Sequence, residues 1–313
     1  MVCFQVFFHN LYTNLSNFAL SADRLSAYDH AICRAFAYKV SSHTTDESFA
    51  KLPYAFPSNP PLPKINKVRS RVAYLSGIKP ELYDCCINSC CCYTGAHENL
   101  RACPYCKEPR FRQNGKARKK FTYIPLIPRL VTFAGNCPIS EKMKYRAHEH
   151  EHTPGKTRDV FDGKKYRRLR SEPVKLNGKT YPHKYFEDAR DIALGLSTDG
   201  FAPFKKRKNT AWPLIIFNYN LPPDIRFHLE HILALGVIPG PKKPIDADSY
   251  LWPLLKELYK LSLGVRAFDI LSGRLFLLRA YLILVFGDIP AVSMLMRMKG
   301  HNGISPCRMC EVI

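Results

Sequence analysis

The sequence is poor in acidic residues. Its 313 residues include 26 Asp and Glu against 47 Lys and Arg, which gives a formal net charge of +21 at pH 7. A surplus of this size indicates a polyanionic partner, of which nucleic acid is the commonest. The surplus is concentrated in residues 101–175, with 20 basic and 7 acidic side chains, so a uniformly basic surface explains it less well.

The sequence also lacks a long apolar run. No uninterrupted apolar segment reaches the ~18 residues that a membrane-spanning helix needs, and the longest candidate is broken by Arg279 and Asp288. We therefore expect no membrane partner. The N-terminus has no basic segment or clear cleavage site typical of an export signal, so the 12 cysteines are expected to be reduced and intracellular. A hydrophobic content of 46% is enough to form a buried core, so we expect a folded chain and not a globally disordered one.

Clustered cysteines provide the strongest spacing. The segment CCINSCCCYTGAHENLRACPYC contains a C-x3-C-x12-C-x2-C pattern, formed by Cys86, Cys90, Cys103 and Cys106. Two close pairs of thiolates separated by a loop are typical of a closed tetrahedral Zn²⁺ site. The spare thiols Cys85, Cys91 and Cys92 leave the ligand choice open, and buried free cysteines or a redox pair are the alternative.

Three other sets of residues are weaker candidates for binding. His301, Cys307 and Cys310 offer three metal ligands near the C-terminus, so a fourth would come from elsewhere or from water, and we expect weaker metal retention there. The alternating histidines of YRAHEHEHTPG could share a metal on a strand, although solvated side chains are the more ordinary interpretation. Basic clusters interleaved with aromatic residues suit DNA phosphates, and the candidates are Lys119, Lys120, Arg167, Arg168, Lys205, Lys206, Arg207 and Lys208.

The pattern from residue 190 onward predicts strand, strand, strand, helix, strand, helix, which is an α/β sheet with mixed pairing. Asp199 and Asp288 each follow an apolar run and lie next to a glycine. A carboxylate held in a buried strand is costly unless it is compensated, and two of them could share Mg²⁺ or Mn²⁺ for phosphodiester chemistry. The alternative is that they cap turns or pair with arginine.

The motifs LGLSTDGFAPF, WPLIIFNYNLPP, FGDIPAVSMLMRMKGHNGISPCRMC and YDCCINSCCCYTG…CPYC together resemble the transposases of the Plavaka group, which are CACTA-like (En/Spm-related) DNA transposases. The resemblance implies a ribonuclease-H-like DDE/D core, with Asp199 and Asp288 as the first two catalytic acids, preceded by a Cys-rich module. It also implies transposon-end and target DNA as partners and location in the nucleus; a homo-oligomer is left open.

We accordingly expect four regions: a helical N-terminal segment with a Pro-rich linker (1–60), a zinc-binding module (61–125), a basic, loop-rich linker (126–189) and a truncated ribonuclease-H-like core (190–313). The family places a third acid well downstream, whereas Glu311, the only acid after Asp288, lies beside the cysteine pair. We therefore expect a transposase fragment that binds DNA, from a family whose intact members carry out metal-dependent strand cleavage and transfer, and we expect no cleavage by this chain because the third acid is missing. The alternatives are a catalytically inactive DNA-binding remnant and a zinc-stabilised interaction protein.

Overall fold

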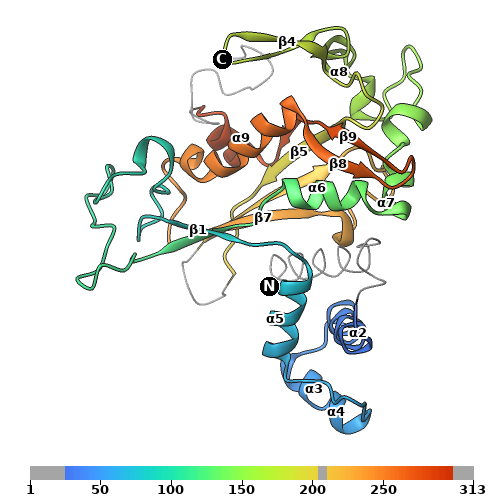
Figure 1. The fold of residues 1–313 in the computed structure, drawn as a ribbon. Coiled ribbons are helices and arrows are strands. Elements are labelled where there is room, and N and C mark those ends of the chain that lie inside the picture. The colour runs from blue at the N-terminus through green and yellow to red at the C-terminus, as the bar shows by residue number, and fades with distance from the viewer. Residues whose placement is uncertain (1–24, 204–209, 299–313) are drawn as a thin grey trace.

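A six-stranded mixed sheet forms the centre of the protein (Figure 1). The computed structural model describes residues 25–203 and 210–298. The strand order in the sheet is β1-β2-β7-β6-β5-β10. Its strands are β1 (Glu81–Asp84), β2 (Lys120–Tyr123), β5 (Ile192–Thr198), β6 (Ala211–Asn218), β7 (Leu233–Pro239) and β10 (Ala280–Phe286). The prediction of an α/β protein with mixed strand pairing is confirmed.

From residue 190 onward, the strands and helices of the sheet region follow the predicted order, and the strand pairing is mixed. β5, β6 and β7 form an antiparallel meander, and β10 pairs with β5 in parallel, with Phe286 opposite Ser197. Two small hairpins lie outside this sheet, and the sequence pattern indicated neither of them. They are formed by β3 (Pro173–Leu176) with β4 (Lys179–Lys184), and by β8 (Val265–Asp269) with β9 (Arg274–Leu278).

Helices and short turns surround the sheet. The long helix α9 is the one predicted after the three strands, and the last predicted helix is α10, which has Pro290 in its first turn. Among the described residues, none of the helices combines the length and the apolar character needed to cross a bilayer. The helical elements are α2 (Ala27–Ser41), α3 (Asp46–Ala50), α4 (Leu52–Ala55), α5 (Ile65–Leu75), η2 (Gly95–His97), α6 (Ile127–Ala134), α7 (Cys137–Lys142), η3 (Tyr145–Glu149), η4 (Val160–Asp162), α8 (Lys164–Leu169), η5 (Leu229–His231), α9 (Ala247–Leu263) and α10 (Ile289–Leu295).

The central strands bury both of their faces. Side chains alternate across a strand, so Ile192, Leu194 and Leu196 of β5 join one core with α6 and α9, whereas Ala193 joins a second core. That second core is built with Phe161 and the β3–β4 hairpin region. Burial on both sides explains why β5, β6 and β7 are nearly continuous apolar runs.

The N-terminal helices form a separate small core. Ile32 and Phe36 of α2 pack against Val68 and Val72 of α5, as the helical periodicity of residues 26–40 indicated. In Figure 1 these helices lie below the sheet.

A buried carboxylate lies immediately before β5, the first strand of the meander. Asp191 is fully buried just before β5, and its Oδ1 has no hydrogen-bond partner among the described residues. Burial raises the pKa of Asp191 to about 7, although Arg279 opposes the shift. An unfolded aspartate titrates near 3.9, so the folded protein holds this proton more tightly.

We predict that Asp191→Asn removes a pH dependence of stability. The tightly held proton favours the folded state below about pH 4, and this contribution is lost as the pH rises through about 7. The variant should therefore gain stability relative to the parent between pH 5 and pH 8, as measured by urea denaturation. Asp224→Asn, at an exposed position, is the control. A stability difference between Asp191→Asn and the parent that stays constant across this pH range would contradict the prediction.

Candidate functional sites

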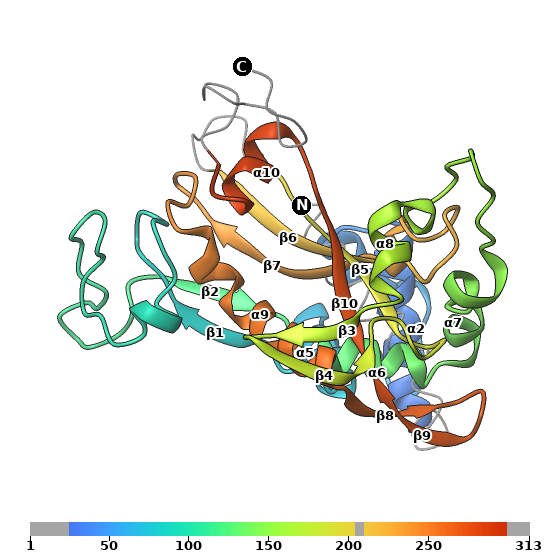
Figure 2. The same ribbon diagram turned by 90° about the horizontal axis from the view of Figure 1, so that it is seen from above.

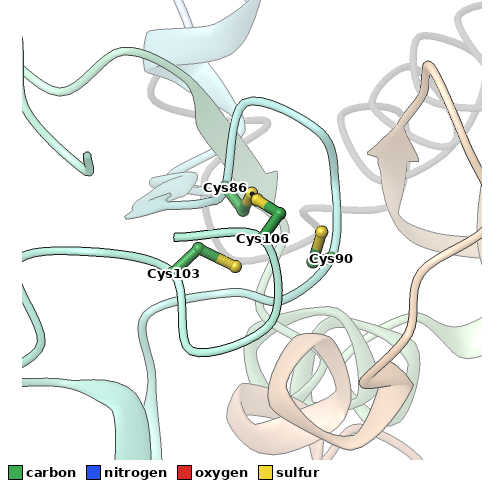
Figure 3. A group of neighbouring side chains, drawn as sticks. All are labelled: Cys86, Cys90, Cys103 and Cys106. Carbon is green, nitrogen blue, oxygen red and sulfur yellow. Dashed lines mark hydrogen bonds between the residues drawn. The ribbon is translucent and has the colours of Figure 1, made fainter. Parts of the chain in front are cut away.

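Four cysteine sulfurs meet in the long loop between β1 and β2 (Figure 3). The Sγ atoms of Cys86, Cys90, Cys103 and Cys106 all lie within 4.8 Å of one another. Each pair is brought together by a tight turn, closed by the Ser89 and Lys107 N–H groups, which donate to the carbonyls of Cys86 and Cys103. The spacing read from the sequence therefore corresponds to one cluster in space.

The three spare thiols lie in two different places. Cys85 and Cys92 face each other across a β-bridge and belong to the main core, away from the four-sulfur group. Cys91 is fully buried with its Sγ 3.9 Å from that of Cys103, which makes it a neighbour of the cluster. The four clustered sulfurs thus remain the best ligand set.

The electrostatics of the cluster suit a divalent cation. Burial raises the pKa values of Cys86 and Cys90, because a thiolate is poorly solvated there. Burial also acts upward on Cys106, but hydrogen bonds from the Glu108 N–H and the Asn88 amide contribute to a pKa of about 7. Zinc binds thiolates and compensates their mutual repulsion. The donor set and its closeness fit a structural Zn²⁺ ion.

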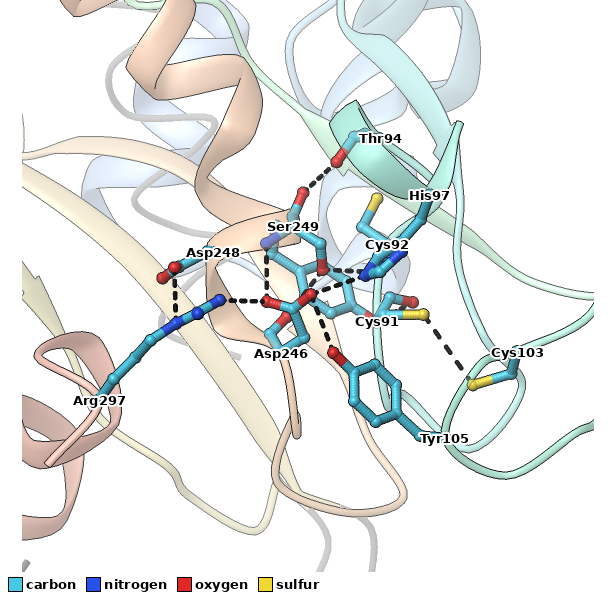
Figure 4. A network of polar contacts seen from close by, with 11 residues as sticks. Cys91, Cys92, Thr94, His97, Cys103, Tyr105, Asp246, Asp248, Ser249 and Arg297 are labelled. Carbon is cyan, nitrogen blue, oxygen red and sulfur yellow. Dashed lines mark hydrogen bonds and ion pairs between the residues drawn. The ribbon is translucent and has the colours of Figure 1, made fainter. Parts of the chain in front are cut away.

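Polar contacts fasten the Cys-rich loop to the rest of the molecule. Asp246, which caps α9, is buried, and its carboxylate accepts from His97 Nε2 at 2.8 Å and Tyr105 OH at 3.3 Å (Figure 4). Arg297 approaches the other oxygen at 3.4 Å. On the other side of the loop, Lys119 Nζ contacts Ser89 Oγ and the carbonyl oxygens of Ile87, Pro239 and Gly240. Sequence reasoning missed Asp246, for which a helix-cap position before ADSYLWPLL was the only signal.

Asp199 and Asp288 come to the same edge of the sheet. Each lies two residues beyond a paired position, Ser197 in β5 or Phe286 in β10, and these strands are parallel neighbours. Both aspartates are exposed. The expectation of carboxylates within buried strands was therefore wrong in this detail, because each acid follows its strand and can remain solvated.

The glycines beside the two acids have steric roles. A Cβ at Gly200 would collide with the indole ring of Trp212, and one at Gly287 would lie 3.0 Å from the Thr198 carbonyl oxygen. Asp288 also caps α10, since its Oδ1 accepts from the Ala291 N–H at 2.7 Å. Asp288 therefore does cap a helix, as the alternative hypothesis stated, but the cap uses only one of its two carboxylate oxygens.

The remaining candidates are spread over the molecule. Lys120 lies exposed on β2, whereas Arg167 and Arg168 are exposed on α8, and Figure 2 shows these elements well apart. Lys119 is half-buried in the contacts given above. The structure does not describe the other sequence-predicted residues, which are Lys205, Lys206, Arg207, Lys208, His301, Cys307 and Cys310.

The alternating histidines have a different arrangement from a metal site. His150 Nε2 and His152 Nδ1 both contact Asp162 Oδ1, at 3.0 and 2.9 Å. Within residues 25–203 and 210–298, the only group of three or more potential ligands at metal-binding distance is the cysteine cluster. These two histidines are therefore best described as hydrogen-bond partners of a buried carboxylate.

The fold and sites describe a mixed α/β protein with a cysteine cluster that could hold a metal ion and a pair of carboxylates at the ends of parallel strands. The model of the transposase family tnp2 matches residues 155–312, just over half of the chain. The chain belongs to this family. Comparisons with curated proteins and with solved structures find no match.

We predict one tightly held zinc per chain, lost in the double variant Cys103→Ser/Cys106→Ser. Removing two of four thiolates leaves an incomplete tetrahedral site. Elemental analysis after gel filtration measures the ratio, and Cys137→Ser, which changes an exposed cysteine on α7, is the control. Unchanged zinc in the double variant, or two zinc ions retained equally firmly, would contradict the prediction.

Proposed function

We propose that the protein binds DNA through a DDE/D-type transposase core in which Asp199 and Asp288 share a divalent cation, the arrangement that serves strand cleavage and transfer in the intact family. The observation that carries the proposal is the parallel pairing of β5 with β10, whose register sends both acids to one edge of the sheet. Family membership supports DNA as the partner. The finer assignment to Plavaka or CACTA-like elements, and location in the nucleus, belong to the same proposal.

The proposed chemistry requires little from the protein besides positioning and charge. Carboxylate oxygens are the ligands that Mg²⁺ and Mn²⁺ prefer. A cation held by Asp199 and Asp288 would polarise the phosphodiester and help to generate the attacking oxygen. In the intact family, water attacks a phosphodiester at the transposon end, and the bond from phosphorus to the 3′-oxygen breaks to free a 3′-hydroxyl. That hydroxyl then attacks a phosphodiester of the target strand, forming one phosphate ester bond as another breaks, so water is the only further reactant.

The strand order supports a ribonuclease-H-like core in residues 190–313. An antiparallel meander, β5 to β7, is followed by α9 and by a strand parallel to the first. The Cys-rich loop within the proposed 61–125 module, the basic 126–189 region and the helical 1–60 segment would surround this core. β1 and β2 extend the same sheet, so in this proposal the module is joined to the core by strand pairing.

We predict that Asp199→Asn/Asp288→Asn abolishes weak Mn²⁺ binding by the chain. The amide keeps the size of each side chain but removes the charge that attracts a hard cation. Mn²⁺ electron paramagnetic resonance measures the bound fraction. The pair Asp224→Asn/Glu230→Gln, in the connection between β6 and β7, is the charge-matched control; Asp224 is exposed and Glu230 is partly exposed. Equal Mn²⁺ binding by parent and test variant would refute a shared cation site.

A nicking assay on DNA carrying transposon ends then separates the functional alternatives. Metal-dependent cutting by the parent and none by the aspartate variant would establish an enzyme. DNA binding without cutting would favour a DNA-binding remnant, and the absence of both would favour the interaction-protein hypothesis.

We predict sequence-tolerant DNA binding that weakens steeply with salt. Each phosphate neutralised by Lys or Arg releases counterions, so the logarithmic salt slope on double-stranded DNA changes by about 0.9 per contact. Changing Lys120, Arg167 and Arg168 to Ala should weaken binding and flatten this slope, as measured by fluorescence anisotropy. Lys119 is kept, because its contacts hold the Cys-rich loop.

The control for this prediction is Lys179→Ala/Lys184→Ala in the β3–β4 hairpin, where both lysines are exposed. A salt response that stays flat in the parent, or test and control variants that bind alike, would count against the proposed basic contacts.

A further inference from the structure

A polar cleft lies between the Cys-rich loop and α10. It has a volume of about 520 Å³, and the loop contributes Tyr105 while the segment before α9 contributes Lys243 and Asp246. The opposite wall comes from α10 and the turn after it, with Ser293 and Arg297. Apolar side chains complete the lining: Pro244, Ile245, Pro290, Met294 and Met298. We call this space the strand cleft.

The strand cleft adjoins the edge of the sheet at which the two carboxylates lie. Its wall includes Pro290, two residues after Asp288, and Lys243 Nζ donates to the Pro290 carbonyl at 3.2 Å. Lys243 also lies over the ring of Trp212, 5.6 Å from its centroid. The same indole packs against Gly200, the residue after Asp199. Lys243 thus contacts Pro290, which lies close to Asp288 in the chain, and Trp212, which packs against the residue after Asp199.

A buried hydroxyl in the cleft wall has no partner. Ser293 is 4% exposed, and its Oγ has no hydrogen bond to any described residue. A buried polar group without a partner costs free energy that a ligand can recover. Asp246 differs, because its carboxylate is already engaged by His97, Tyr105 and Arg297. The cleft therefore offers a ligand the Lys243 ammonium and a hydroxyl that has no partner among the described residues, whereas Arg297 is already paired with Asp246 and, at 2.8 Å, with Asp248.

These features match a nucleotide better than a metal ion or a purely apolar ligand. Lys243 suits a phosphate, and the buried Ser293 hydroxyl in the wall of the cleft would supply a second donor, as charged and hydroxyl donors do in many phosphate contacts. The methionine and proline walls offer apolar contact to a sugar or an unstacked base, and Tyr105 adds a ring on which a base can stack.

We propose that the strand cleft binds one nucleotide of a single DNA strand next to the phosphodiester handled by Asp199 and Asp288. The proposal rests on the proposed function, since it names where the DNA strand lies relative to that site. Tyr105 is located between Cys103 and Cys106, so the metal-binding turn supplies one wall of the cleft. The Cys-rich loop would then contact DNA in addition to stabilising the fold.

The test uses the full chain and a short, fluorescently labelled, single-stranded oligothymidylate. Lys243→Gln should bind it about tenfold more weakly, the scale of one lost charge-assisted contact, with a salt slope reduced by about 0.7. Lys256→Gln, an exposed lysine on α9 that also lies near a tryptophan ring, should match the parent.

Ser293→Ala gives a second readout that a merely structural role would not produce. It removes a hydroxyl that is unsatisfied without ligand, so thermal stability should be unchanged or higher while oligonucleotide affinity falls. If the parent binds no oligonucleotide, the proposed function fails and this inference fails with it. If the parent binds with the expected salt dependence but Lys243→Gln and Ser293→Ala behave like Lys256→Gln, the strand cleft alone is refuted.

Discussion

The parallel pairing of β10 with β5 is the constraint on which the rest of the structure depends. The chain leaves β5, completes β6, β7, α9 and the β8–β9 hairpin, and only then returns beside its starting strand. A bulge between Leu282 and Leu284 adds one residue to β10. Without that residue the last part of β10 would move by one position, and because side chains alternate, it would turn its side chains to the opposite face. The placement of Asp288 opposite Asp199, the start of α10 and the strand cleft all follow from this register.

The buried carboxylate of Asp246 has a comparable role for the Cys-rich loop. A buried charge needs compensation, and here the donors come from two segments, His97 and Tyr105 from the Cys-rich loop and Arg297 from the turn after α10. The same side chain caps α9 by accepting from the Ser249 N–H. One acid thus joins the cysteine loop, the main core helix and the segment after α10. A loop fastened in this way is placed relative to the sheet, and metal binding at its cysteines would influence the sheet edge as well as the loop.

Much of the architecture could be predicted because it is encoded locally. The periodicity of residues 190–295 predicted the order of the meander, α9, β10 and α10, and the cysteine spacing identified the cluster. The β8–β9 hairpin was missed because VRAFD and RLFLL are short, partly exposed strands joined by a turn. Contacts such as that of His97 with Asp246 join residues 149 positions apart, and no local pattern reports such a pairing. The strand cleft depends on several contacts of this kind, so it could only be found in three dimensions.

The surplus of basic residues is a second case in which the sequence alone could not locate a site. Lys119 and Lys120 are adjacent in the sequence and equal in any count of charge, yet successive side chains near a strand point in opposite directions. Lys119 turns inward to four oxygen acceptors, whereas Lys120 is exposed. Burial lowers the pKa of Lys119, in keeping with a structural cation surrounded by protein oxygens. Net charge therefore predicts that a polyanion is attracted to this protein but does not locate its path. The path is better sought where Lys243 lines a cleft whose wall holds a hydroxyl without a partner among the described residues, next to the sheet edge that carries Asp199 and Asp288.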